Sequence, residues 1–83
     1  MTSSAVNMVA LVEHIAKALV DVPDEVEVEA FEEGGQTVIE LFVAEDDLGR
    51  IIGRQGRMAR SLRAIVNAAA LRTHKRYQLE IVE

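Results

Sequence analysis

Hydrophobic residues recur at two different spacings along this chain of 83 residues, and each spacing predicts a type of element. From residue 5 to residue 20 they recur every three or four positions, as on one face of a helix. The residues on that face are Met8, Leu11, Val12, Ile15 and Leu19. Ser3 or Ser4 is placed to cap the start of this helix. Pro23 disfavours helical geometry at Val22, so the helix is expected to end there.

Two strands joined by a tight turn are predicted next. Residues 25–31 alternate acidic and apolar side chains, which is typical of a strand with one buried face. Val26, Val28 and Ala30 face one way, and Glu25, Glu27 and Glu29 face the other. Gly34 and Gly35 permit the positive φ angles of a turn. Residues 37–43 are more apolar, so we expect this second strand to lie at the centre of the sheet.

The rest of the chain predicts two helices and a third strand. A short helix opens with Asp46 or Asp47 near its N-terminus and ends at Gly53. A longer helix runs from residue 57 to about residue 72, and residues 77–82 form the last strand. The apolar face of the longer helix contains Met58, Leu62, Ile65, Val66 and Ala69, and one side of the strand contains Tyr77, Leu79 and Ile81.

The predicted order of elements is α-β-β-α-α-β, which indicates a two-layer α/β sandwich of the α+β kind with a three-stranded sheet. The length fits one domain over residues 1–83, with residues 1–4 expected to be a flexible N-terminus. No apolar run approaches the roughly 20 residues that a membrane helix needs. The first residues also lack the pattern of a signal peptide. We therefore expect a soluble, cytoplasmic protein that makes no membrane contact.

Charge is distributed unevenly and changes this picture. The chain carries a net charge of −5, yet residues 48–79 contain eight Lys or Arg and no Asp or Glu. The remainder holds Lys17 alone against all 14 acids. The eight cationic residues are Arg50, Arg54, Arg57, Arg60, Arg63, Arg72, Lys75 and Arg76. This segregation indicates a basic working face on an acidic body.

Several classes of chemistry lack the residues they need. The chain has no cysteine, which excludes a disulfide framework and a thiolate metal site. His14 and His74 have no partners at metal-binding spacing, so no metal or cofactor is expected. Helix capping explains the acids at 45–47 more simply than a bound cation does. No constellation of nucleophile, base and orienting residue is present, so we expect no catalysis.

Gly53 and Gly56 stand three residues apart between the two helices of the second half. The spacing fits neither a P-loop nor a dinucleotide-binding fingerprint. It fits the G-x-x-G loop that clamps a nucleic-acid backbone. Without a Cβ, glycine lets the main chain turn sharply and approach a phosphate. The helix that follows offers unpaired N–H groups, and Arg54 and Arg57 add cationic side chains.

The stretch "GRIIGRQGRMARSLRAIVNAAA" resembles the core of a KH domain, whose motif is I-I-G-x-x-G followed by basic and apolar helix positions. The order of elements resembles the bacterial type II arrangement. Nearly all of the chain is similar to the KH-domain RNA-binding protein A family, small bacterial proteins that consist of little more than one KH domain. "IIGRQGR" is the most specific part of this resemblance.

The resemblance implies sequence-tolerant binding of about four nucleotides of single-stranded RNA, without catalysis. It implies that residues 53–56 hold the phosphates and that Ile51, Ile52 and Ala59 form the floor of a groove under the bases. Many KH domains have a larger aliphatic residue in place of Ala59, so a shallower groove is expected. The predicted RNA-binding residues are Arg50, Ile51, Ile52, Gly53, Arg54, Gln55, Gly56, Arg57, Ala59 and Arg60.

The family resemblance also implies a homodimer or a heterodimer with a second KH-domain protein, and a role as an RNA chaperone or post-transcriptional regulator. Ala64, Ala68 and Leu71 lie opposite the main apolar face of their helix, where small side chains allow a protein contact. The alternative is that alanine is simply a good helix former.

Two further alternatives stay open. Arg50, Arg60 and Arg63 can each be surface residues that pair with acids of the other segment. The whole chain can be a protein-interaction module on a KH scaffold whose RNA binding is weak or depends on a partner, since net negative charge opposes RNA.

Overall fold

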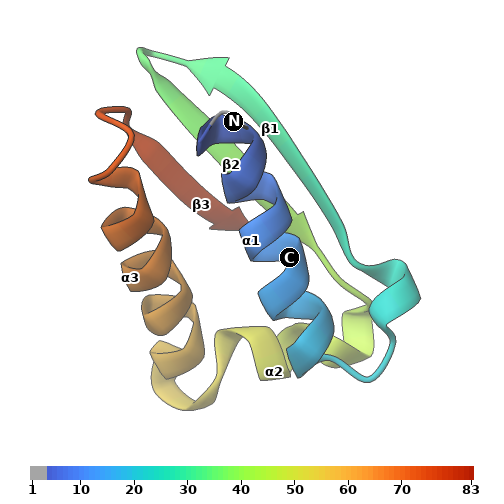
Figure 1. Ribbon diagram of the computed structural model, residues 1–83. Helices are drawn as coiled ribbons and strands as arrows, with labels where there is room; N and C mark the ends of the chain where they lie inside the picture. The colour runs from blue at the N-terminus through green and yellow to red at the C-terminus, as the bar shows by residue number, and fades with distance from the viewer. Residues whose placement is uncertain (1–3) are drawn as a thin grey trace.

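The computed structural model describes residues 4–83, and the side chains of residues 8–83. Three α-helices lie on one face of a three-stranded sheet (Figure 1). The elements are α1 (Ser4–Leu19), β1 (Glu27–Glu33), β2 (Gln36–Phe42), α2 (Leu48–Ile52), α3 (Arg57–Ala70) and β3 (Tyr77–Ile81). This is the predicted order α-β-β-α-α-β, and the two-layer α+β architecture is confirmed. Residues 1–3 of the predicted flexible N-terminus lie outside the described part, and residue 4 begins α1.

Helix α1 buries side chains at a spacing of four residues. Met8, Val12 and Ala16 are buried in the core, with the other predicted apolar positions packed beside them. Pro23 begins a single 3-10 turn, and Val22 before it has the non-helical angles φ −119° and ψ 73°. The predicted end of the helix is therefore confirmed. The predicted serine cap involves side chains outside the described ones.

The sheet has the strand order β1-β2-β3, so β2 is central as predicted. It is antiparallel to β1 and parallel to β3, with Ile39 opposite both Ala30 and Leu79. Gly34 and Gly35 form the turn between β1 and β2 at φ 60° and 81°. A parallel pair requires a crossover connection, and α2 and α3 supply it. The segment that carries the glycine loop is therefore fixed at both ends by the sheet.

Strand β1 differs from its prediction. It begins at Glu27 rather than residue 25, and Val26 is buried just before it. Val28 is half-buried, but Ala30 is exposed, so the predicted burial of Ala30 is wrong. An edge strand has a single neighbour, and the helix packed on this one is α1. Alternation shows which side chains of a strand face the helices. It does not show how far along the strand a helix covers those side chains.

The buried face of α3 is also rotated from its predicted centre. Its fully buried residues are Ala59, Leu62, Val66 and Ala70. Ile65 was expected on this face but is 42% exposed. Successive residues of a helix are turned by about 100°, and packing against β3 selects the side of Val66 rather than that of Ile65. On β3 itself, Tyr77 and Leu79 are buried and Ile81 is half-buried, as predicted.

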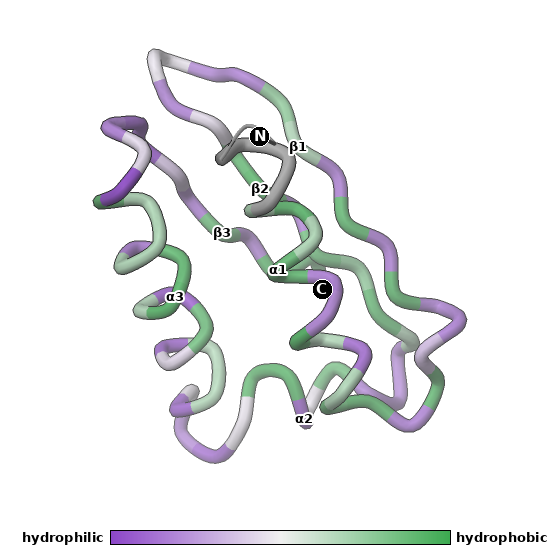
Figure 2. The backbone as a smooth tube through the Cα atoms, in the orientation of Figure 1, coloured by the Kyte–Doolittle hydropathy of each residue, from purple (hydrophilic) through white to green (hydrophobic). Residues whose placement is uncertain are grey.

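A single core joins the sheet to all three helices. Its most completely buried residues include Val12, Ile39, Leu41 and Ile51. Figure 2 shows that hydrophobic residues gather in β2 and α2, and that hydrophilic residues lie at both ends of α3. Across the described residues, no helix has the length and apolar character needed to cross a bilayer. The core thus fixes α2 and α3 on either side of a polar loop.

Candidate nucleic-acid interface

The loop between α2 and α3 has an unusual backbone. Gly53 has φ 78°, Gln55 has φ 56° and Gly56 has φ 75°, so three of its four residues lie in the positive-φ region. The Gly53 N–H donates to the Gly49 carbonyl at 2.8 Å and closes α2. The Gly56 N–H donates to the Gly53 carbonyl at 3.1 Å and closes one 3-10 turn. The loop is therefore a short, hydrogen-bonded structure rather than an open linker.

Gly53 is required by packing as well as by conformation. A Cβ on this residue would lie 2.7 Å from both the Cβ and the backbone N of Met58. Real Cβ atoms do not approach so closely, so any side chain at residue 53 would push α3 away from α2. Gly56 differs, because its Cβ would meet Arg60 Nη1 at 3.4 Å. The sequence predicted the need for glycine, but not this contact between α2 and α3.

The N-terminus of α3 opens directly onto the loop. Gly56 occupies the cap position with φ 75° and ψ 14°, and no side chain caps the helix by a hydrogen bond. The first N–H groups of an α-helix have no partner within the helix, and the helix dipole gives this end a partial positive charge. The 14 residues of α3 thus present donors to an anion at the loop.

Four arginines surround this loop in three different ways. Arg54 and Arg57 are exposed and make no ion pair with any described side chain. Arg60 donates from Nη1 to the Gln55 carbonyl at 3.0 Å. This hydrogen bond helps to hold Gln55 in its left-handed conformation. Arg50 donates from Nη2 to Asp21 Oδ2 at 2.9 Å. Pairing with an acid of the other segment is therefore confirmed for Arg50 but not for Arg60.

The apolar residues predicted as the groove floor separate in the structure. Ile51 is 0% exposed and belongs to the core, so it supports the loop from within and offers no surface to a base. Ala59 is buried at 6% exposure on the inner face of α3. Ile52 is half-buried at the end of α2. Of these three residues, Ile52 is placed best to contact a ligand beside the loop.

Asp47 has a role that the sequence interpretation missed. It was expected to cap the short helix, but it makes no side-chain capping hydrogen bond. It is 2% exposed, and its carboxylate accepts hydrogen bonds from the backbone N–H groups of Asp21 and Val22, each at 3.0 Å. Capping is therefore the wrong explanation for Asp47. Its carboxylate fastens the segment after α1 to the start of α2. The sequence gives no sign of this role, because the partners of Asp47 are backbone N–H groups, which every residue type carries.

The remaining predicted residues lie on the outer surface of α3, or directly after it in the case of Leu71. Ala64, Ala68 and Leu71 are exposed, as expected for a facet opposite the core, and Leu71 is 81% exposed. Arg63 donates from Nε to the Leu79 carbonyl at 3.3 Å and pairs with no acid among the described residues. The described residues contain no cluster of three His, Cys, Asp or Glu able to hold a metal ion.

The glycine loop between two helices, set on a sheet that they cross over, defines this protein as a KH domain. Comparison with known families agrees. The family model described as "KhpA/KhpB, KH domain" matches residues 9–81. The chain belongs to the KhpA/KhpB KH-domain family.

Curated relatives are similar over almost their whole length. A protein of Halalkalibacterium halodurans, named RNA-binding protein KhpA, is 50% identical over 92% of this chain and 100% of its own. Proteins of the same name from Borreliella burgdorferi and Aquifex aeolicus are 46% and 48% identical. These matches cover 93% and 88% of this chain, and 94% and 92% of those proteins.

Solved structures of the protein Era contain a similar fold. The Aquifex aeolicus Era structure matches 89% of this chain and 29% of its own, with a TM-score of 0.62 and 22% sequence identity. A second Era structure, solved with a segment of 16S ribosomal RNA, gives the same TM-score and identity over 89% of this chain and 28% of its own. At this identity the likeness concerns the fold alone.

Proposed function

We propose that this protein binds single-stranded RNA through the glycine loop, without catalysing a reaction. The observation that carries the proposal is the loop itself, where positive-φ backbone meets an uncapped helix N-terminus. Arg54 and Arg57 are exposed beside it without acid partners among the described side chains. The names of the curated relatives, RNA-binding proteins, support the same function.

The binding mode follows from these groups. Backbone N–H donors at the start of α3 and the two arginine side chains suit phosphate oxygens, which carry no sequence information. About four nucleotides span such a loop. The half-buried Ile52 gives an apolar contact beside it, while Ile51 and Ala59 hold α2 and α3 in place. Contacts to the RNA backbone therefore dominate, and we propose sequence-tolerant binding.

A second copy of this chain or a second KH-domain protein is part of the proposal. A single loop that holds about four nucleotides binds RNA weakly, and two linked loops bind with a higher combined affinity. Ala64 and Ala68 on α3, with Leu71 directly after the helix, form an exposed facet that suits such a partner. The proposed role is that of a cytoplasmic RNA chaperone or post-transcriptional regulator.

Replacing Arg54 and Gln55 together by Asp tests the loop. We expect the variant R54D/Q55D to lose RNA binding at low salt, because two new negative charges repel the phosphates where Arg54 attracted them. Amide NMR spectra of the labelled protein, with and without a short mixed-sequence RNA, measure this. In the unmodified protein the shifts should be confined to residues around 50–60.

The variant H14D/R72D is the matched control. It makes the same change in formal charge at two exposed residues away from the loop, His14 on α1 and Arg72 in the turn after α3. It should retain the shifts. If R54D/Q55D binds RNA as tightly as H14D/R72D, the assignment of the loop is contradicted.

The runner-up is a protein-interaction module whose RNA binding is weak or depends on a partner. The pairing of Arg50 with Asp21 and the 81% exposure of Leu71 favour it. It predicts a folded protein that shows no shifts around the loop at low salt but assembles to a higher mass in solution. A titration with short RNAs, together with a measurement of the mass in solution, separates the two functions.

A further inference from the structure

The sheet has one face that no described element covers. Helices α1, α2 and α3 all lie on the other face (Figure 1). Side chains of a strand alternate between the two faces of a sheet. Thr37, Ile39 and Leu41 are buried beneath the helices, so the even-numbered residues of β2 lie on the uncovered side, here called the open face. The strand residues of the open face are Glu27, Glu29, Phe31, Glu33, Gln36, Val38, Glu40, Phe42, Gln78 and Glu80.

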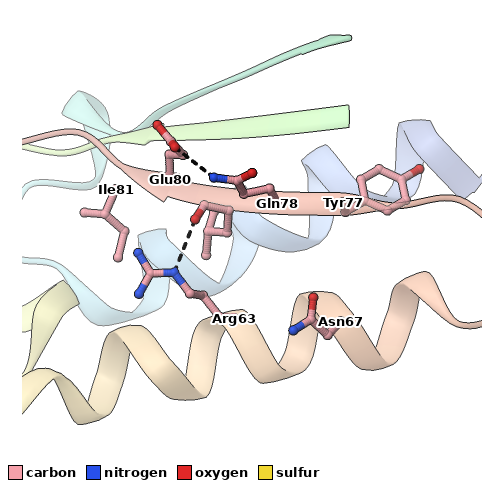
Figure 3. A pocket seen from close by; sticks show the side chains of 7 residues that line it. Arg63, Asn67, Tyr77, Gln78, Glu80 and Ile81 are labelled. Atoms are coloured by element: carbon pink, nitrogen blue, oxygen red, sulfur yellow. Dashed lines mark hydrogen bonds between the residues drawn. The ribbon is translucent and has the colours of Figure 1, made fainter. Parts of the chain in front are cut away.

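Side chains on the β3 part of the open face are held in place by hydrogen bonds. In Figure 3, Gln78 and Glu80 extend from β3 on the side away from α3, whereas Arg63 reaches β3 from α3. Gln36 donates from Nε2 to Gln78 Oε1 at 2.9 Å, and Gln78 donates from Nε2 to Glu80 Oε2 at 2.9 Å. The Glu80 carboxylate is therefore fixed on the open face and directed away from the helices.

A row of three glutamates crosses the open face from strand to strand. Glu29 on β1 is directly opposite Glu40 on β2, and Glu40 is in register with Glu80 on β3. Neighbouring strands lie about 4.8 Å apart, so the row spans about 10 Å. Like charges at directly opposite positions destabilise a sheet. None of the three carboxylates forms a salt bridge with a described cation. Positive charges supplied by a ligand would relieve this repulsion.

Apolar side chains flank the glutamate row on both sides. Phe31 is opposite Val38 on one side of the row, and Phe42 is opposite Glu27 on the other. Phe31 is 42% exposed, whereas Val38 is only 3% exposed although it does not belong to the core beneath the helices. Phe31 and Phe42 are separated by four positions along the strands, or about 13 Å. The open face thus offers two apolar contacts with carboxylates between them, which a partner can cover.

Cations are scarce at the open face. The three strands contain no Lys or Arg. Every acid in them except Glu32 lies on the open face. Arg76, directly before β3, is about 13 Å along the strand from the glutamate row. A surface of a single charge repels ligands of the same sign and attracts those of the opposite sign. The open face is therefore unsuited to RNA and suited to a cationic partner.

We propose that the open face docks a basic amphipathic helix of another protein. Its Lys or Arg side chains lie over the glutamate row, and its apolar side chains contact Phe31 and Phe42. A helix packs naturally on an uncovered sheet face. Apolar residues seven apart, with cations three and four positions after the first, share one helix face and match the spacing of the open face. Arginine suits the site best, because a guanidinium pairs with carboxylates and stacks on aromatic rings. This proposal is independent of RNA binding at the glycine loop.

A synthetic helical peptide of about 18 residues is the probe, since shorter helices are unstable in isolation. It carries two Leu seven residues apart and two Arg between them on the same face. The control peptide has Gln in place of both Leu, so it keeps the charge and loses the apolar contacts. Binding is measured at low salt from the amide NMR shifts of the labelled protein, and the dispersion of the same spectra verifies folding.

The variant E29Q/E40Q tests the glutamate row, with E13Q/E32Q as its matched control. Both variants replace two glutamates by glutamine and change the net charge equally. Glu13 is on α1, and Glu32 lies on the helix side of β1, opposite the buried Thr37. Glu32 accepts a hydrogen bond from the Thr37 hydroxyl, which a glutamine oxygen can also accept. The two variants therefore differ in the face of the sheet that loses charge.

We expect the Leu-containing peptide to shift the amides of the three strands around Glu29, Glu40 and Glu80. E29Q/E40Q should bind it several-fold more weakly than the unmodified protein, and E13Q/E32Q should bind it equally well. The control peptide should bind the unmodified protein several-fold more weakly, because it makes no apolar contact with Phe31 or Phe42. R54D/Q55D should bind the Leu-containing peptide at least as tightly as the unmodified protein, since the loop takes no part.

Four results would overturn the proposal. The first is equal binding of the Leu-containing peptide by E29Q/E40Q and the unmodified protein. The second is equal weakening in E13Q/E32Q, because the effect would then come from net charge. The third is equal binding of the two peptides, which would reduce the contact to the attraction of a polycation. The fourth is loss of the peptide in R54D/Q55D, or shifts confined to the helices, which would place the contact elsewhere.

Discussion

Gly53 has φ 78° and ψ 169°, a backbone region that is occupied almost entirely by glycine. Its neighbour Gln55 has φ 56°, which an L-residue adopts at a cost of about 1–2 kcal/mol. The Arg60 side chain offsets part of that cost through its hydrogen bond to the Gln55 carbonyl. At the scale of single residues, the interface is therefore a strained backbone held by its surroundings.

Gly53→Ala should reduce the free energy of unfolding by about 2 kcal/mol or more, because a Cβ forces both strain and a clash with Met58. Urea unfolding followed by circular dichroism measures this. Gly49→Ala is the control, since a Cβ there meets nothing within 4 Å and the residue lies in helical α2. That change should be neutral or slightly stabilising. Equal effects of the two substitutions would contradict the role of the close approach.

Helix α2 is only five residues long, and contacts at both of its ends hold it in place. Asp47 ties its start to the segment after α1, and Gly53 brings its end against α3. Short helices are unstable in isolation, so these contacts decide where α2 lies. At the scale of elements, the contacts of Asp47 and Gly53 that hold α2 therefore also position the loop.

Asp47→Ala should lower the free energy of unfolding by about 2 kcal/mol, because two backbone N–H groups lose a charged acceptor. It should also weaken RNA binding, since α2 and the loop then move relative to α1. Thermal unfolding and an RNA titration measure the two effects. Asp46→Ala, at an exposed neighbour, should change neither. A stable Asp47→Ala protein would show that the carboxylate does not fasten these segments.

The elements themselves could be predicted from the sequence, because periodicity and glycine positions are local signals. Helix and strand bounds agree to within about two residues, the usual uncertainty at element ends. Ala30, Ile65 and Asp47 could not be placed correctly, because their burial depends on which element lies over them. The bonds of Arg50 and Arg60 likewise connect groups whose proximity only the folded chain creates. The loop could be predicted because Gly53 and Gly56 are needed for its own backbone conformation, which is a local property of the sequence.

The whole molecule separates its functions among its surfaces. RNA contacts are proposed at the glycine loop, whereas the small facet of Ala64, Ala68 and Leu71 faces outward. These surfaces are distinct, so a partner on the facet and RNA at the loop do not compete for the same side chains. At the scale of the whole molecule, assembly and RNA binding should therefore be separable by substitution.

Ala68→Arg should abolish self-association while leaving the RNA-induced NMR shifts at the loop in place, because a large charged side chain prevents a close helix contact. Sedimentation measures the mass in solution. Ala18→Arg, at an exposed position of α1, is the control and should keep the original mass. A variant at residue 68 that assembles like the control would show that the facet is not the interface.

The unequal distribution of charge also sets how RNA and protein meet. At physiological ionic strength electrostatic forces decay over about 8 Å, much less than the 34 Å long axis of the described fold. A nucleic acid approaching the arginine side therefore hardly senses the carboxylates across the molecule, and the overall negative sign loses its influence. We expect RNA that approaches the β1 side to be repelled and RNA that approaches the arginine side to be attracted. Productive collisions should then begin with the protein already oriented, so that association is selective for direction before any close contact forms.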